Sequence, residues 1–182
     1  APGAWVPGLL PGLPVSWEIV RKPLFWFPTS TDQYNRSNGA GVFFLETPGG
    51  EFYGFPSLDG ETVKVAEHTA GVNISDPLTV ERDVLSVDLP PLAEYLEAYM
   101  PGLSTEPVRH TVCLYTRTPD LDFIVDHHPE HSGVAIACGF SGHGFKFTPI
   151  IGSILADLAL DGRTEHSIGF LSATRPGLLR PD

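Results

Sequence analysis

One strand-like segment near the middle of the chain carries two side chains that could take part in chemistry. In "ETVKVAEH", residues 61–68, the two-residue period of a β-strand places Lys64 and His68 on one face and Glu67 on the other. Tyr53, in the preceding strand-like segment, is expected on the same sheet. An ammonium, an imidazole and a phenol on one sheet surface could bind a carboxylate and assist redox chemistry. From this spacing alone, an edge strand with a solvated outer face is the simpler interpretation.

A glycine-rich segment further along the chain is more specific. "GFSGHGFKF", residues 139–147, holds three glycines and Lys146 between an apolar run and a helix-like run. Glycines let backbone N–H groups approach a ligand, and the start of a helix carries partial positive charge, so the segment suits an anion or an electron-rich ring edge. The alternative is a strand-to-helix turn whose lysine points into water. The spacing excludes a phosphate loop, and no G-x-G-x-x-G follows an early strand.

The chain has two cysteines, whose spacing indicates neither a disulfide framework nor a metal knuckle. Cys113 has Arg109, His110 and Arg117 as sequence neighbours, and such cations favour a thiolate if the thiol is exposed. A small buried hydrophobe is the ordinary alternative for Cys113. The residues alone leave both roles open for Cys113.

The segment "HHPEH", residues 127–131, contains three histidines and a glutamate. Pro129 prevents a regular helix from placing His127 and His131 one turn apart, and no carboxylate-rich partner motif is evident. We therefore predict no metal site.

Composition limits the class of protein. The chain has 182 residues, of which 42% are hydrophobic, so it is long enough to bury the core of about one globular domain. Its net charge of -11 repels polyanions and its cations are scattered, which argues against a nucleic-acid partner. No stretch approaches the roughly 20 apolar residues of a membrane span, and the first residues lack the basic start of a secretory signal. We expect a cytoplasmic protein without membrane contact.

The first half of the chain predicts an antiparallel sheet followed by two helices. "WEIVRKPLFWF" is strand-like, and Pro23 predicts that it lies at an edge or a bend. "GVFFLE", "EFYGF" and "ETVKVAEH" are separated by the turn sequences "TPGG" and "PSLDG", which indicates a meander. Helices are expected over "DPLTVERDVLSV", with Asp76 as N-cap and Pro77 in the first turn, and over "PPLAEYLEAYM".

The second half predicts strands and a final helix. "VRHTVCLYT" and "DFIVD" are strand-like, and the nearly all-apolar "GVAIACGF" is typical of a strand covered on both faces in a parallel sheet. A helix follows, with Thr148 as cap, Pro149 in the first turn and Gly162 after its end. "RPGLLRPD" at the C-terminus is expected to be a loose tail. The elements together predict an α+β fold that ends in a strand, glycine loop and helix of α/β type.

Several of these segments, in this order, resemble one family of flavoenzymes. From "PGAW" to "RPGL", nearly the whole chain is similar to the C-terminal half of the monomeric sarcosine oxidase and N-methyltryptophan oxidase family, within the D-amino-acid-oxidase-like superfamily. The matching segments are "EFYGFPS", the strand with Lys64 and His68, "YMPG", "VCLYT", "DFIVDHHPEHSGVAIACGFSGHGFKF" and "GRTEHSI".

The resemblance implies an FAD-dependent fold with two parts. The expected substrate-binding domain is an antiparallel or mixed sheet with helices over residues 16–110. Residues 1–15 would end the FAD-binding domain, residues 111–170 would return to it and contact the flavin, and residues 171–182 would form a tail. The half with the G-x-G-x-x-G motif is the expected missing partner. Because Ala1 is not an initiator methionine and "PGAW" resembles the interior of a domain, we expect a fragment. Because the half that binds most of the ADP moiety is the missing one, we expect this fragment to be inactive alone.

The resemblance also implies roles for individual residues. Family members hold FAD through a cysteine thioether, and Cys113 in "VCLYT" matches that cysteine. Lys64 matches the lysine that faces the flavin through water and promotes its reaction with oxygen. Lys146 matches the lysine that binds the substrate carboxylate. The remaining matches are catalytic positions at Tyr53, His68 and Tyr115, flavin contacts at Gly142, His143, Gly144, Phe145 and Lys146, and a substrate contact at Phe44, where close relatives have methionine.

The implied activity is oxidation of a small N-methyl amino acid by oxygen. For sarcosine the products would be glycine, formaldehyde and hydrogen peroxide. Oxidation of another secondary amine, such as N-methyltryptophan, pipecolate or a fructosyl amino acid, is the alternative within the fold. A β-rich binding module without catalysis is the alternative from another class, and the joint presence of Cys113, Lys146, Lys64 and His68 argues against it.

Overall fold

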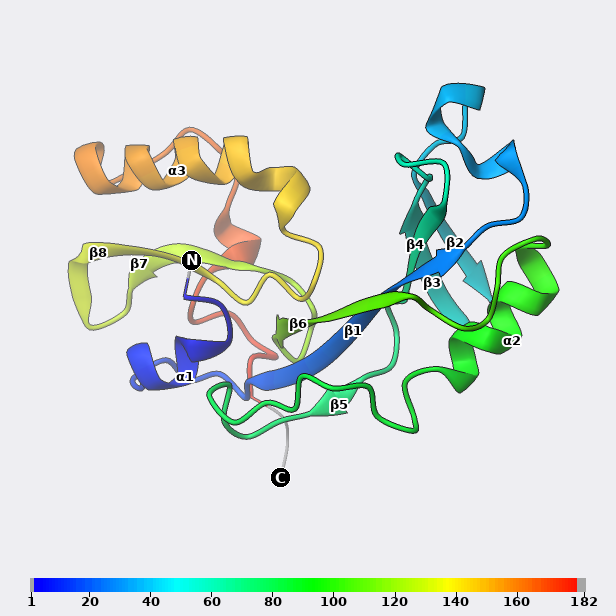
Figure 1. Ribbon diagram of the computed structural model, residues 1–182. Coiled ribbons are helices and arrows are strands. Elements are labelled where there is room, and N and C mark those ends of the chain that lie inside the picture. Colours follow the sequence, from blue (N-terminus) through cyan, green and yellow to red (C-terminus); the bar gives the residue numbers. More distant parts are fainter. Residues whose placement is uncertain (1, 180–182) are drawn as a thin grey trace. The chain divides into compact units, whose positions relative to one another are not determined.

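The computed structural model describes residues 2–179 (Figure 1). The chain divides into two compact units. Among the described residues, the first unit comprises 2–20, 73–78 and 114–179, and the second comprises 21–72 and 79–113. Strands β1 (Glu18–Pro28) and β6 (Arg109–Arg117) contribute residues to both units.

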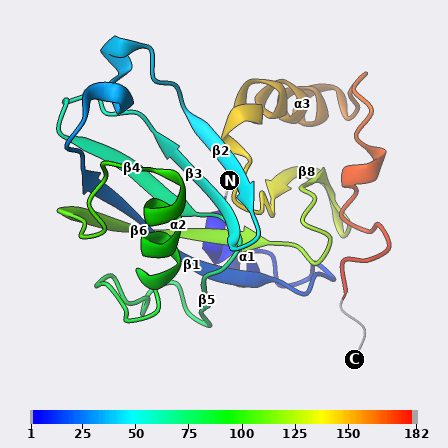
Figure 2. The same ribbon diagram turned by 90° about the vertical axis from the view of Figure 1, so that its right-hand side faces the viewer.

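A mainly antiparallel sheet forms most of the second unit (Figure 2). Strands β2 (Phe43–Thr47), β3 (Gly50–Phe55) and β4 (Thr62–Glu67) follow one another as a meander, which confirms the prediction from the turns between them. β1 pairs with β4, β6 pairs with β1, and the two-residue β5 (Val72–Asn73) completes the order β2-β3-β4-β1-β5.

β1 lies inside this sheet, whereas its proline predicted an edge or a bend. The residues of β1 that pair with β4 are Phe25–Pro28, so Pro23 lies before the paired stretch. Proline cannot donate a backbone hydrogen bond, and at this place none is needed for pairing with β4.

One face of the sheet packs on helix α2 (Pro90–Tyr99). The helix begins with two prolines, which fit the first turn, and it ends before Pro101-Gly102, as predicted. Its buried side chains Leu92, Tyr95 and Leu96 are spaced as one helical face. Tyr95 stacks on Phe52, with 4.1 Å between ring centroids and 10° between planes. The sheet contributes the buried residues Phe25, Phe27, Phe52, Val63 and Val65.

The helix predicted over "DPLTVERDVLSV" is wrong. The Asp76 carboxylate accepts a hydrogen bond from the Leu78 N–H, which makes a turn. Further along the segment, buried Arg21 donates to the carbonyls of Glu81 (2.8 Å) and Asp83 (2.6 Å) and pairs with Asp88 at 2.8 Å. A side chain some 60 residues away thus takes backbone acceptors that a helix would use.

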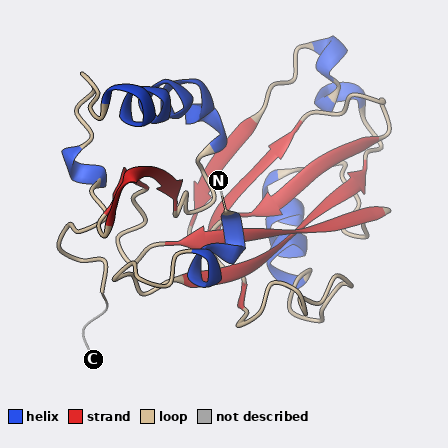
Figure 3. Cartoon of the chain, turned by 90° about the vertical axis from the view of Figure 1, so that its left-hand side faces the viewer, coloured by secondary structure: helices blue, strands red, loops and turns tan. Residues whose placement is uncertain are grey.

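An antiparallel hairpin, β7 (Ile124–His128) with β8 (His131–Cys138), forms the centre of the first unit. Alternate residues of the hairpin point into two clusters, Ile124 and Ile136 into one and Val125 and Ala137 into the other. Helix α3 (Thr148–Asp161) covers the second cluster, and residues near the short helix α1 (Val6–Leu9) cover the first (Figure 3). Coverage on both faces confirms the prediction for the last residues of β8, 136–138, whereas Val134 earlier in the strand is 45% exposed.

Two other expectations for this unit need correction. Among residues 2–179 the strand partner of β8 is β7, which is antiparallel, and not a parallel neighbour. Helix α3 has its predicted range and ends at Gly162 with φ 70°, but its N-cap is Phe147, and the Thr148 hydroxyl donates to the Phe145 carbonyl at 2.7 Å. The remaining 3₁₀ turns are η1 (Gly3–Trp5), η2 (Asp32–Tyr34), η3 (Arg36–Asn38), η4 (Phe145–Phe147) and η5 (Gly169–Leu171).

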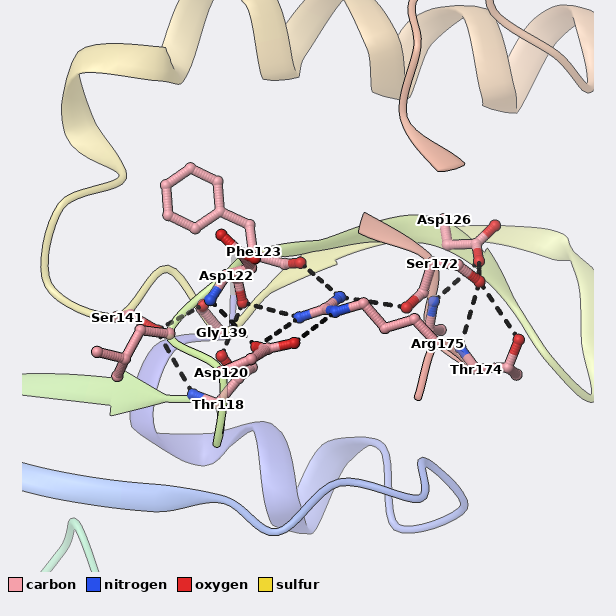
Figure 4. Close-up of polar contacts among 12 residues, drawn as sticks. Thr118, Asp120, Asp122, Phe123, Asp126, Gly139, Ser141, Ser172, Thr174 and Arg175 are labelled. Carbon is pink, nitrogen blue, oxygen red and sulfur yellow. Dashed lines mark hydrogen bonds and ion pairs between the residues drawn. The ribbon is translucent and has the colours of Figure 1, made fainter. Parts of the chain in front are cut away.

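The C-terminal segment is packed as far as Leu178, so its description as a loose tail is wrong there; residues 180–182 lie outside the described residues. Leu178 is 2% exposed and its carbonyl accepts from the Ser16 N–H. Arg175 pairs with Asp120 through two hydrogen bonds of 2.8 and 2.9 Å, and it also donates to the Phe123 carbonyl (Figure 4). None of the helices within residues 2–179 has the length and apolar character needed to cross a bilayer.

Candidate active site

The face of the second unit's sheet opposite α2 brings together three predicted site residues. Phe44 on β2 and Tyr53 on β3 are direct cross-strand partners. The His68 ring lies edge-on to both, with centroids 5.5 Å from Phe44 and 6.2 Å from Tyr53. The predicted alternation of Lys64 with the buried Val63 and Val65 agrees with the structure. Aromatic rings and an imidazole therefore share one open surface.

Lys64 lies between two aromatic side chains on this surface. In the sheet register, Trp26 of β1 and Phe55 of β3 are both directly opposite Lys64. The Lys64 Nζ lies 5.5 Å from the Trp26 ring centroid and 5.0 Å from that of Phe55. The guanidinium of Arg109 lies 3.7 Å from the centroid of the Trp26 ring. These three neighbours were not predicted, although alternation along "WEIVRKPLFWF" and "EFYGF" could have indicated Trp26 and Phe55.

The turn before β4 is fixed by Asp59. Its carboxylate accepts hydrogen bonds from the backbone N–H groups of Glu61 and Thr62 and from the hydroxyls of Thr62 and Ser57. These bonds favour the charged form and hold the Asp59 pKa well below its ordinary value. The "PSLDG" turn thus sets where β4, and Lys64 on it, begins.

The two cysteines lie in different surroundings. Cys113 on β6 is exposed, and the hydrogen bond that Arg82 donates to the Val112 carbonyl, at 2.9 Å, holds the strand beside it. Cys138 on β8 is buried, and burial raises the pKa of its thiol to about 12. Only Cys113 therefore presents a thiol that a large ligand can reach, which excludes its interpretation as a small buried hydrophobe.

The glycine loop of the first unit packs on its own aromatic side chains. Gly142 has φ 88°, and a Cβ there would lie 2.3 Å from the Tyr115 ring. A Cβ on Gly144 would lie 2.5 Å from the Phe140 side chain. Between the glycines at 139 and 142, Ser141 has a positive φ of 50°, which is uncommon for a residue with a side chain. The interpretation that glycines serve ligand approach alone is therefore incomplete, because packing within the chain already requires them.

The loop also leaves polar and apolar groups available. The N–H groups of Gly142 and Gly144 make no backbone hydrogen bond within residues 2–179. The His143 ring packs on Phe123, with 4.7 Å between centroids. Phe145 is 93% exposed, and Lys146 is exposed with its Nζ 5.4 Å from the centroid of the Phe147 ring. This surface offers backbone donors, one cation and an uncovered aromatic ring.

The histidine segment does not form a metal-binding cluster among the described residues. The rings of His128 and His131 lie 4.9 Å apart, and the His127 Nε2 lies 3.2 Å from the Gly162 carbonyl oxygen. The histidines belong to the β7–β8 hairpin and its packing.

Comparison with known proteins identifies the class of protein to which the chain belongs. The family model of FAD dependent oxidoreductases matches residues 1–158. The fold also matches solved oxidase structures, including glycine oxidase from Geobacillus kaustophilus (TM-score 0.73, 21% identity, 95% of this chain and 44% of that one). Fructosyl peptide oxidase from E. terrenum has the same TM-score of 0.73 at 20% identity, over 97% of this chain and 44% of that one. The chain belongs to the FAD-dependent oxidoreductase family.

Curated relatives show which members of the family the chain is similar to. Monomeric sarcosine oxidase of Arthrobacter sp. (strain TE1826) is 42% identical over 180 residues, which cover 97% of this chain and 46% of that protein. N-methyl-L-tryptophan oxidase of Salmonella typhi is 38% identical over 166 residues, covering 89% of this chain and 42% of that protein. The chain thus spans about half the length of the curated relatives it matches, and its resemblance to this pair of oxidases is confirmed.

Proposed function

We propose that the chain is the C-terminal, flavin- and substrate-facing half of an amine oxidase that demethylates sarcosine or a similar N-methyl amino acid. The observation that carries the proposal is the open sheet face with Lys64, His68, Tyr53 and Phe44, in a chain 42% identical to a monomeric sarcosine oxidase. Residues 16–110 would form the substrate-binding part, and residues 1–15 and 111–170, which include Cys113 and the glycine loop, the flavin-binding part. The complete enzyme would work in the cytoplasm, where the thiol of Cys113 stays reduced until it is linked.

The residues present fit FAD. Cys113 offers an exposed thiol for a covalent bond, whereas Cys138 is buried. Gly142 and Gly144 offer backbone N–H groups, and Gly142, His143, Gly144, Phe145 and Lys146 would lie along the flavin ring. When bound, FAD supplies the two-electron oxidation of the amine and passes the electrons to oxygen, so that sarcosine, water and oxygen give glycine, formaldehyde and hydrogen peroxide.

Lys64 would assist the reaction with oxygen. Transfer of an electron to oxygen creates negative charge, and a fixed ammonium a few Å away in a low-dielectric site stabilises that charge as it forms. Lys64 is partly buried, and its neighbours Val63 and Val65 are fully buried on the reverse face of the strand, which suits a charge that must stay in place. The role predicts that a neutral residue at 64 slows reoxidation more than it weakens amine binding.

The other residues would bind and orient the substrate. Lys146 is an exposed cation that can pair with the substrate carboxylate. His68 and Tyr53 on the open sheet face would contact the amine and hold its reacting atoms in position. Tyr115, matched by the same resemblance, would also act on the substrate. Phe44, which is 56% exposed, would form part of the pocket wall and influence which amine enters.

The first test is the intact mass of the flavin-loaded protein after denaturation. We expect an added FAD mass that maps to Cys113, and its loss in Cys113→Ser. Cys138→Ala is the matched control and should keep the adduct, because Cys138 is buried. A bare polypeptide mass in a protein that turns over amines would contradict the covalent link.

The substrate class is tested by measuring hydrogen peroxide release from sarcosine, N-methyltryptophan, pipecolate and a fructosyl amino acid with the holoenzyme. The proposal expects the highest kcat/KM with a small N-methyl amino acid. A preference for one of the bulkier amines would identify the alternative oxidase, and no flavin reduction by any amine would favour a non-catalytic module.

A further inference from the structure

We propose that Trp26 and Phe55 are positioning residues that hold the Lys64 ammonium in place without neutralising it. The proposal rests on the function proposed above, in which Lys64 assists the reaction with oxygen. Its observation is a row of three side chains on three adjacent strands, with Lys64 in the middle and an aromatic ring directly opposite it on each side.

Sheet geometry sets this row. Directly opposite residues on antiparallel strands have their Cβ atoms about 4.5–5.5 Å apart, so a lysine between two aromatic residues must pass along their rings. The distances from Nζ to the ring centroids, 5.5 Å for Trp26 and 5.0 Å for Phe55, lie within the range of cation–π attraction. Two neighbouring strands therefore hold one ammonium from both sides.

The choice of aromatic partners has an electrostatic consequence. A carboxylate would hold Lys64 as well, but its negative charge would cancel the field that developing charge on oxygen would feel. Within residues 2–179 no carboxylate forms an ion pair with Lys64. A ring face attracts a cation through its quadrupole and has no net charge, so the ammonium keeps its full charge.

Arg109 supports the row from outside. Its guanidinium lies 3.7 Å from the Trp26 ring centroid, which is a stacking distance for a planar cation. This contact restrains the indole that in turn restrains Lys64. Phe55 is 45% exposed and contributes little to the buried core, so its contact with Lys64 gives it a role that packing does not.

The simpler alternative is a lysine whose aliphatic part merely covers apolar surface while the ammonium moves in water. Reductive methylation with ¹³C-formaldehyde, read by NMR, separates the two, because the chain has only three lysines, Lys22, Lys64 and Lys146. Lys22 is 2% exposed and should react poorly. The proposal expects a Lys64 dimethylammonium signal moved upfield by ring currents, assigned by its absence in Lys64→Arg.

Variants test which rings cause the shift. Trp26→Leu and Phe55→Leu should each move the Lys64 signal toward the position of a solvated lysine, and Trp26→Phe should restore most of the shift. Trp17→Phe is the matched control, because Trp17 belongs to a cluster of the first unit. A wild-type signal at the solvated position, or one that neither leucine variant moves, would overturn the proposal.

The holoenzyme gives the functional test. Trp26→Leu and Phe55→Leu should lower the second-order rate constant for oxygen about threefold to tenfold, as expected for loss of one cation–π contact, with flavin reduction by the amine unchanged. If the rate constant for oxygen is the same in wild type and both leucine variants but is lowered in Lys64→Met, the positioning role of the rings is overturned and the role of Lys64 stands. An unchanged oxygen rate in Lys64→Met would instead overturn the role of Lys64, while the NMR result still shows whether the rings hold it.

Discussion

Lys64 and Lys146 are supported in opposite ways. Lys64 lies on β4, between the paired strands β1 and β3, and its neighbours Val63 and Val65 are fully buried on the reverse face. Lys146 lies on the single turn η4, after the glycine loop, and its Nζ is near the Phe147 ring. The position of the first lysine depends on strand register and core packing, whereas that of the second depends on the backbone conformation of a loop.

This difference suits the two proposed roles. A charge that stabilises a reacting atom works best when it is held within a fraction of an ångström by rigid elements. A charge that captures a flexible substrate carboxylate can move, since binding itself orders it. We therefore expect variants of the sheet to change the rate of chemistry and variants of the loop to change substrate binding.

The largest effect should come from the packed face beneath Lys64. Phe52→Ala removes a ring that is 1% exposed and stacks on Tyr95, and such a change costs about 3–5 kcal/mol of unfolding free energy. Phe44→Ala, on the open face and 56% exposed, should change stability by less than about 0.5 kcal/mol. Urea unfolding of both variants measures this difference. Equal losses of unfolding free energy in the two variants would mean that the two faces of the sheet do not differ in how tightly they are packed.

The two lysines should differ in kinetics. Lys64→Met in the holoenzyme should lower the rate constant for oxygen by about 10²-fold or more, as for loss of one fixed charge-stabilising group, with little change in amine binding. Lys146→Met should raise the KM for the amine about fivefold at most, since the exposed pair it would form is worth up to about 1 kcal/mol. Stopped-flow measurement of the two half-reactions separates these effects. The same kinetic pattern in both variants would contradict the comparison.

The glycine loop should respond to a single methyl group. Gly142→Ala forces a Cβ into the Tyr115 ring at a φ of 88°. We expect the free energy of unfolding to fall by about 1–3 kcal/mol and flavin binding to weaken. Gly152→Ala is the matched control, because its Cβ would lie in open space within α3 and should stabilise the helix by about 0.5–1 kcal/mol. A harmless Gly142→Ala would show that the loop conformation is not fixed by Tyr115.

The sequence could predict the setting of Lys64 better than that of Lys146. A strand period of two and two clear turns were enough to place Lys64 and His68 on one face of a meander. The aromatic row across β1, β4 and β3 needed the strand order, which joins residues some 40 apart in sequence. For the glycine loop, the contacts with Tyr115 and Phe140 depend on tertiary packing and could not be inferred from "GFSGHGFKF".

The helix that was wrongly predicted over residues 76–87 also reflects tertiary contacts that the local sequence does not reveal. Asp76 and Pro77 are good helix-start residues, but propensity is weak compared with a buried ion pair. Arg21 and Asp88 are 1% and 4% exposed, and Arg21 takes two loop carbonyls in addition. Local patterns therefore predicted elements that the core stabilises and failed where one distant charged side chain decides the backbone.

The smallest effect concerns the ion pair between Asp120 and Arg175, in a loop that supports the glycine loop. Thr118, at the start of that loop, donates to the Ser141 hydroxyl at 3.4 Å, and Phe123, just after it, packs on His143. Hydrogen bonds from Arg175 lower the Asp120 pKa from its ordinary 3.8 to about 2. Because the pKa is lower in the folded protein, the stabilisation is complete above about pH 4 and is lost as the pH falls toward 2.

Asp120→Asn removes this pH dependence. Because the pair is partly exposed, we expect Asp120→Asn to lower the free energy of unfolding by at most about 1 kcal/mol at pH 6. At pH 2, where the carboxylate becomes protonated, the variant and wild type should be about equally stable. Hydrogen exchange of residues 139–147 should be faster in the variant at pH 6, whereas exchange in β4 should be unchanged, because Asp120 belongs to the first unit. Faster exchange in β4 as well would mean that the support of Lys64 also depends on this ion pair, and the contrast between the two lysines would then fail.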